Sequence, residues 1–182
     1  MTVINKLECL NEDRLTQTLA YAGFILLAFE LIKSLVIKPT KMFYADISFS
    51  PNSPFQSYEE NVLSRHKNEF EACLLYLSDF MKAIDSDDVL AIQGLRKHRN
   101  DLAHNFPKII SILKIENHIE LLEKAHKALF KLSNYQVYMD IGNDPEFQNL
   151  GIDWDTVKGT EYLILENIIN KIRFLQSNSK SQ

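Results

Sequence analysis

Basic residues are concentrated in the middle of the chain, where they could bind phosphate. Arg96, Lys97, His98, Arg99, His104 and Lys108 fall within thirteen positions, opposed only by Asp101. The chain as a whole is acidic, with a net charge of −4 and a pI of about 5.7, so it has no overall positive field to attract nucleic acid. Any contact with RNA must therefore come from this segment, with Arg96, Lys97 and Lys108 either as phosphate contacts or as ordinary surface charge.

Arg99 occupies an unusual place in the helix that this segment predicts, from about residue 87 to residue 105. Apolar residues recur there at helical spacing, at Val89, Ile92, Leu95, Leu102 and Phe106. At about 100° per residue, Arg99 falls near the middle of this apolar stripe, although a guanidinium is costly to bury without a partner. Either Arg99 is paired inside a helical bundle, or the stripe faces a partner subunit or a phosphate. His98 should lie away from the stripe, which predicts a solvated histidine.

His104 follows Arg99 by five residues, which on a straight helix places the two side chains roughly 140° apart. Pro107 disfavours helical geometry at Phe106, so we expect the helix to end close to His104 and to leave the imidazole freer in direction. Two-fold symmetry offers a second route, because each subunit of a dimer could contribute its own pair to one site.

The six residues Arg99-Asn100-Asp101-Leu102-Ala103-His104 resemble the Arg-x4–6-His motif of the HEPN superfamily, the higher eukaryotes and prokaryotes nucleotide-binding domains. The setting is similar as well, with a motif near the end of a mid-chain helix in a small helical bundle. Catalytic members of the family are metal-independent endoribonucleases that dimerise so that two motifs form one cleft. The resemblance implies an RNA substrate, a homodimer, an antitoxin protein as partner, and a role in a toxin or anti-phage defence system. We expect no cofactor and no metal ion.

The resemblance also implies a role for each residue. Arg99 would bind the scissile phosphate and stabilise its developing charge, and His104 would move protons as general base or acid. Asn100 would orient the histidine or the phosphate, and the RNA 2′-hydroxyl would attack to leave a cyclic phosphate end. In the toxin branch paired with a nucleotidyltransferase antitoxin, a modifiable tyrosine commonly follows the histidine by two positions, but this chain has Phe106 there.

Two other interpretations stay open. The chain could be a non-catalytic HEPN-like module that binds nucleotides or proteins, with His104 turned away from any cleft. It could instead be a structural interaction protein, in which case an acidic residue of the same chain should cover Arg99. Glu123 and His126 have the spacing of half a ferritin-like metal site, but no second pair accompanies them, so we expect a surface pair.

The elements that must position the motif are helices, because long segments repeat apolar residues at helical spacing. We expect helices at about 13–37, 58–84, 87–105, 107–132 and 159–175. The stretches 39–57 and 134–158 hold most of the prolines and glycines and predict two irregular connectors. The sequence therefore predicts an all-α fold, an up-down bundle of four to five helices, with one domain over residues 1–175 and a disordered tail over 176–182.

Cysteine usage and hydropathy predict a cytoplasmic protein without a membrane span. Cys9 and Cys73 give neither a zinc spacing nor a disulfide framework, and Cys73 falls on an apolar helix face as a small buried hydrophobe. The first eleven residues lack the pattern of a secretory signal. The most apolar segment, residues 20–29, is soon interrupted by Glu30 and Lys33. A span needs about 20 apolar residues, so we expect a buried helix there.

Overall fold

The computed structural model of the chain describes residues 12–45, 53, 55–109, 113, 118–142, 144–148 and 150–179. Every regular element in these ranges is helical, which confirms the all-α class. The longer helices are α2 (Glu12–Ala45), α4 (Glu69–Asp79), α5 (Ser86–Ile109), α6 (Ile119–Ile141) and α8 (Thr160–Ser179). The short elements are α3 (Tyr58–Asn61), η1 (Leu63–Arg65), α7 (Pro145–Gln148) and η3 (Trp154–Thr156).

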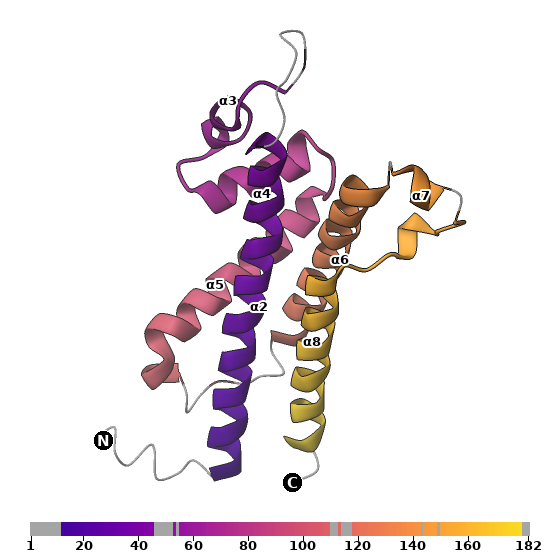
Figure 1. The fold of residues 1–182 in the computed structure, drawn as a ribbon. Coiled ribbons are helices and arrows are strands. Elements are labelled where there is room, and N and C mark those ends of the chain that lie inside the picture. The colour runs from indigo at the N-terminus through magenta and orange to yellow at the C-terminus, as the bar shows by residue number, and fades with distance from the viewer. Residues whose placement is uncertain are drawn as a thin grey trace.

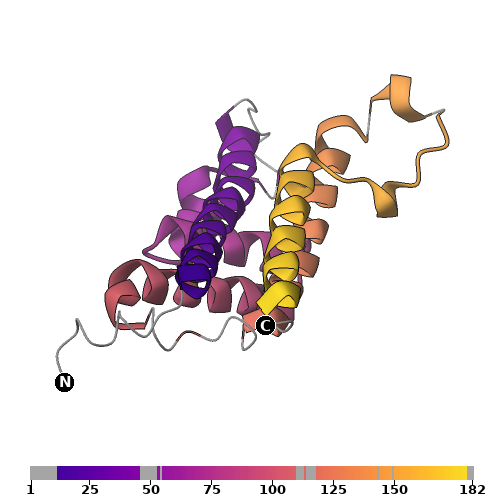
Figure 2. The same cartoon turned by 90° about the horizontal axis from the view of Figure 1, so that it is seen from below.

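Helix α2 is the centre of the bundle. It packs against α4, α5, α6 and α8, with α8 alongside it and α5 crossing behind it (Figures 1 and 2). Apolar residues occur on most of its sides, and Tyr21, Ile25, Ile32 and Val36 are fully buried. A helix that is apolar all round needs neighbours on several sides, which explains the position of α2 among the others.

The length and composition of α2 would also allow it to cross a membrane. Residues 14–45 contain a window with a mean hydropathy of 1.9. This is weak evidence, because the buried core helix of a soluble protein meets the same criterion. The exposed side of α2 carries Glu30, Lys33, Lys38 and Lys41, charges that are unfavourable in contact with lipid.

Helix α2 continues through Pro39 to Ala45, so the end expected at residue 37 is wrong. Proline lacks an N–H, and the Leu35 carbonyl therefore loses its α-helical donor. Aromatic packing anchors the segment beyond the proline. The Tyr44 hydroxyl donates to the Tyr76 hydroxyl at 3.0 Å, and the ring centroids of Phe43 and Phe55 lie 5.0 Å apart.

Helix α5 likewise continues through Pro107 to Ile109, so it does not end close to His104 as expected. The residue whose carbonyl loses its donor is Ala103, which is exposed, and water can supply the missing hydrogen bond. Phe106 packs against the hydrophobic core and holds the last turns in place. His104 is therefore inside a regular helix and does not have the rotational freedom of a terminal turn.

The other helix boundaries also differ from the sequence expectation. The segment 58–84 is divided into α3, η1 and α4, because the Asn68 side chain caps α4 by accepting a hydrogen bond from the Glu71 backbone N–H at 3.3 Å. Helix α6 begins at Ile119 and runs nine residues past the expected end at residue 132. Helix α8 runs to Ser179, beyond the expected boundary at 175, and residues 180–182 lie outside the described part of the chain.

The buried stripe of α5 provides a direct test of the fold. The side chains of Leu102 and Leu90 lie on the same helix, but Leu102 is 1% exposed and Leu90 is 65% exposed. We expect Leu102→Ala to lower the free energy of unfolding by about 3 kcal/mol, because it leaves a cavity in the core. Leu90→Ala should change it by less than about 0.5 kcal/mol. Urea denaturation of both variants measures the difference, and equal losses would show that α5 faces the other way.

Candidate active site

The Arg99 side chain is paired inside the chain. Its Nη2 donates to Glu30 Oε1 of α2 at 3.0 Å, and its Nη1 donates to Asn100 Oδ1 at 3.2 Å. The guanidinium carbon lies 5.5 Å from the centroid of the Phe29 ring, a cation–π distance. Arg99 Nε is buried and has no hydrogen-bond partner among the described residues. Of the two explanations for a charge in the apolar stripe, the structure therefore favours pairing within the bundle.

The ion pair between Arg99 and Glu30 lies at the edge of the core. The Arg99 side chain is 29% exposed and the Glu30 side chain 53% exposed, so water screens their attraction. An exposed ion pair of this kind contributes at most about 1 kcal/mol. A phosphate that approached from solvent could therefore replace the Glu30 carboxylate as the partner of the guanidinium.

His104 lies on a different face of α5. It shares this face with Lys97, Asp101 and Lys108, which follow one another at steps of three and four residues, and all four are exposed. Because α5 is regular here, the directions of Arg99 and His104 differ by roughly 140°. A single chain thus places Asn100 beside Arg99 but does not bring Arg99 and His104 together.

The apolar stripe of α5 is covered by the chain itself. Val89, Ile92, Leu95 and Leu102 are buried, and Phe106 is half-buried against the same core. The stripe is therefore not an uncovered surface that a partner subunit has to bury. A dimer that completed the site would have to use other surfaces, such as the exposed side of α5.

Arg96 has a structural partner rather than a free guanidinium. It forms a salt bridge with Glu71 of α4, and its guanidinium carbon lies 5.5 Å from the centroid of the Phe70 ring. Glu71 is largely buried and also accepts a hydrogen bond from Gln93 Nε2 at 2.7 Å. A buried carboxylate needs such partners, so Arg96 is less suited to phosphate contact than the exposed Lys97 and Lys108.

His98 is buried, so the expectation of a solvated surface histidine is wrong. Its Nε2 forms a hydrogen bond with the Tyr21 hydroxyl at 2.8 Å, and its ring stacks on His118 with the centroids 3.8 Å apart. Burial, and secondarily the neighbouring His118, lower the pKa of His98 to about 4. Burial also lowers the pKa of His118, so both imidazoles are neutral at pH 7.

Sequence reasoning missed the partners of the basic segment on other helices. Glu30 was visible only as a charge that interrupts an apolar run, and Tyr21 and His118 carried no spacing signal. The one usable signal was that a lone carboxylate in an apolar helix needs a cation. Periodicity places residues on faces of one helix, but it does not pair residues that lie 69 positions apart, as Arg99 and Glu30 do.

The remaining candidate groups have structural roles. The ring of His126 stacks on Tyr162 at 5.0 Å, and Glu123 forms a salt bridge with Arg173 at 3.4 Å. No cluster of metal-ligating side chains occurs within the described ranges. Cys73 is buried as predicted, whereas Cys9 lies outside those ranges. Comparisons with protein families, curated proteins and solved structures found no match to this chain.

Variants of the neighbouring residues Arg96 and Lys97 distinguish a charge with a structural role from an exposed surface charge. We expect Arg96→Ala to lower the free energy of unfolding by about 2 kcal/mol, because it leaves the Glu71 carboxylate largely buried without its cation. Lys97→Ala should change it by less than about 0.5 kcal/mol. Urea denaturation at constant ionic strength measures both values. A loss of similar size in the two variants would contradict the role of Arg96 as the partner of Glu71.

The stacked pair of His98 and His118 predicts a pH dependence of stability. Each imidazole is a base whose pKa is lower in the folded state than the ordinary value of 6.5. The unfolded chain then binds more protons, so stability is full above about pH 6.5 and falls as the pH decreases toward 4. Thermal midpoints across this range should drop less steeply for His98→Gln than for the wild type. A slope for His98→Gln as steep as that of the wild type would contradict the role of this pair.

Proposed function

We propose that the chain is a metal-independent endoribonuclease that acts as a homodimer, with two copies of the Arg99–His104 motif lining one cleft. The observation that carries the proposal is that the Arg99 side chain is 29% exposed while His104 is exposed on the same helix. Both groups are accessible from solvent, and their different directions require a second copy to bring an arginine and a histidine to one phosphate. The resemblance of Arg99–His104 to the HEPN motif supports the same assignment.

The chemistry needs only these side chains and the RNA. A neutral imidazole removes the proton of the 2′-hydroxyl, and the oxygen attacks the adjacent phosphorus. The guanidinium stabilises the negative charge of the five-coordinate phosphorane. The bond from phosphorus to the 5′-oxygen then breaks, and an imidazolium returns a proton to the leaving oxygen. The products are a cyclic 2′,3′-phosphate and a free 5′-hydroxyl.

Glu30 would act as a stand-in for the substrate in this scheme. In the free protein, Glu30 binds Arg99 through a single 3.0 Å contact. Its exposed carboxylate can move into water when a phosphate binds. Asn100 holds the other Nη atom at 3.2 Å and would keep the guanidinium oriented during this exchange. Lys97 and Lys108 would add phosphate contacts beside His104.

The biological setting follows from the resemblance alone. A ribonuclease of this type would be a cytoplasmic toxin or anti-phage effector, and an antitoxin protein would keep it inactive. A partner of this kind would need to cover the exposed face of α5 that carries Lys97, His104 and Lys108. An acidic surface on the antitoxin would suit this face.

One observation favours a second candidate function, that of a structural helical interaction protein. An acidic residue of the same chain, Glu30, covers Arg99, as expected if Arg99 only joins α5 to α2. In this case, Arg99 would contribute to stability and His104 would be an ordinary surface histidine.

Matched variants distinguish the two functions. We expect purified protein to cleave single-stranded RNA in the presence of EDTA, and Arg99→Ala and His104→Ala each to lower the rate at least about 100-fold. Glu30→Gln breaks the same ion pair but frees the guanidinium, so the rate should be equal to or higher than that of the wild type. Lys171→Ala on α8 controls for the loss of one exposed charge. Circular dichroism checks that every variant is folded.

Two results would contradict the proposal. If wild type and both motif variants cleave RNA equally, the activity belongs to a contaminant. If no cleavage occurs, and Arg99→Ala and Glu30→Gln lower the thermal midpoint by the same amount, then Arg99 serves only as the partner of Glu30. Mixing Arg99→Ala with His104→Ala tests the dimer, because a mixed dimer would regain one complete pair.

A further inference from the structure

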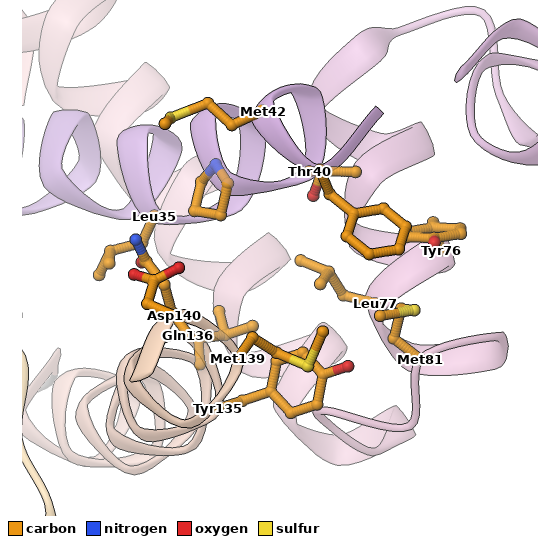
Figure 3. Close-up of a pocket in the computed structure, with 13 residues that line it drawn as sticks. Leu35, Thr40, Met42, Tyr76, Leu77, Met81, Tyr135, Gln136, Met139 and Asp140 are labelled. Carbon is orange, nitrogen blue, oxygen red and sulfur yellow. The ribbon is translucent and has the colours of Figure 1, made fainter. Parts of the chain in front are cut away.

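A cavity of about 290 Å³ lies between α2, α4 and α6, away from the motif on α5 (Figure 3). Its walls are mainly apolar and include Leu35, Leu77, Met81 and Leu132. Ligand pockets in proteins start at roughly 300 Å³, so the cavity is large enough for a small organic molecule. No residue of α5 lines it, and its function is therefore separate from that of the Arg99–His104 motif.

Three helices present their carboxyl ends to this cavity. The residues of their last turns that line it are Met42 and Phe43 of α2, Tyr76 and Leu77 of α4, and Met139 and Asp140 of α6. The carboxyl end of a helix carries a partial negative charge, which lysine or arginine in the last turn commonly offsets. None of these three last turns contains a basic residue. The ends of α4 and α6 therefore place partial negative charge beside the cavity, whereas Lys38 and Lys41 precede the last turn of α2.

Lys38, Lys41 and Lys82 are chain neighbours of residues that line the cavity, but none of the three lines it. Lys41 forms a salt bridge with Glu69 at 2.8 Å. Arg65 of η1 lies 5.7 Å from the centroid of the Tyr76 ring and contacts Asp79 Oδ2 at 3.5 Å. Arg65 does not line the cavity. It offsets the carboxyl end of α4 from outside and leaves the interior without a positive charge of its own.

Acceptors for hydrogen bonds are placed at one end of the cavity. Asp140 and Gln136 lie next to each other there, near Leu35 (Figure 3). Asp140 is the only charged residue among the described residues that line the cavity. Pro39 also lines the cavity, and because it has no N–H, the Leu35 carbonyl lacks its α-helical donor. Among the described lining residues, this end of the cavity thus offers a carboxylate and an amide, but no cationic side chain.

We propose that the cavity binds a small organic cation, an ammonium or guanidinium group on an aryl or alkyl body. The body would fill the space between Leu77, Leu132 and Met81, and the charged head would lie beside Asp140 and donate to it. The ring of Tyr135, which also lines the cavity, adds a face that attracts cations. A carboxylate ligand of the same shape would be repelled by Asp140, and a neutral one would gain no electrostatic attraction from it.

Three probes with one body and different heads test the proposal: 3-phenylpropylammonium, 3-phenylpropanol and 3-phenylpropionate. Titration calorimetry on the full chain should give a dissociation constant about tenfold lower for the cation than for the alcohol. Binding of the anion should be weaker still. Asp140→Asn should reduce the preference for the cation to less than about threefold. Glu120→Gln removes an exposed carboxylate at the opposite end of α6 and should leave the preference unchanged.

The location is tested with a variant at the mouth of the cavity. Met139 is 39% exposed, so Met139→Trp can close the opening with little risk to folding, and it should abolish binding of all three probes. Amide chemical-shift mapping on the wild type gives the same information without a variant, and the shifts should fall on the ends of α2, α4 and α6. Equal affinity for the three probes, no detectable binding of the cation at millimolar concentration, or shifts centred on α5 would overturn the proposal.

Discussion

The structure depends on the burial of α2, a 34-residue helix with apolar residues on most of its sides. The apolar sides of such a helix are removed from water only if other helices cover them from several directions. Contact with α4, α5, α6 and α8 fulfils this requirement. The same contact decides which face of α5 points inward. Arg99 lies on that inward face, and Glu30 is the residue of α2 that meets it. The most unusual side chain of the motif is thus held by the helix that organises the whole bundle.

The motif consequently has two halves with different surroundings. Arg99 is tied to α2 by an ion pair, a ring contact and its neighbour Asn100, whereas His104 faces water on the opposite part of α5. Geometry of this kind suits a site that is complete only in an assembly, where one motif supplies the phosphate-binding group and another supplies the proton carrier. It also suits a helix whose arginine serves only to join two elements. The ribonuclease activity therefore stays a prediction, and the response to breaking the Arg99–Glu30 pair distinguishes the two cases.

The helical class followed from periodicity alone, because apolar repeats of α5, α6 and α8 are long and regular. Local rules failed where packing outweighed them. Pro39 and Pro107 were expected to stop helices, but the aromatic anchors of Tyr44 and Phe43 and the half-buried Phe106 hold the chain helical beyond them. Periodicity also predicted the direction of the apolar stripe of α5. It did not predict how wide the buried face of the helix is, and His98 was therefore expected in solvent. The pairing of Arg99 with Glu30 could not be predicted, because it depends on how two helices cross.

The methionines around the cavity make this part of the protein sensitive to oxidation. Met42 and Met139 are exposed residues of its lining, whereas Met81 is partly buried. Peroxide converts an exposed thioether to a sulfoxide, which is polar and accepts hydrogen bonds strongly. Oxidation would therefore make the entrance of the cavity more hydrophilic and change which ligands it binds. Helix α5, which carries Arg99 and His104, would stay chemically intact. Oxidation during storage of the purified protein would therefore change the cavity and leave the Arg99–His104 motif unchanged.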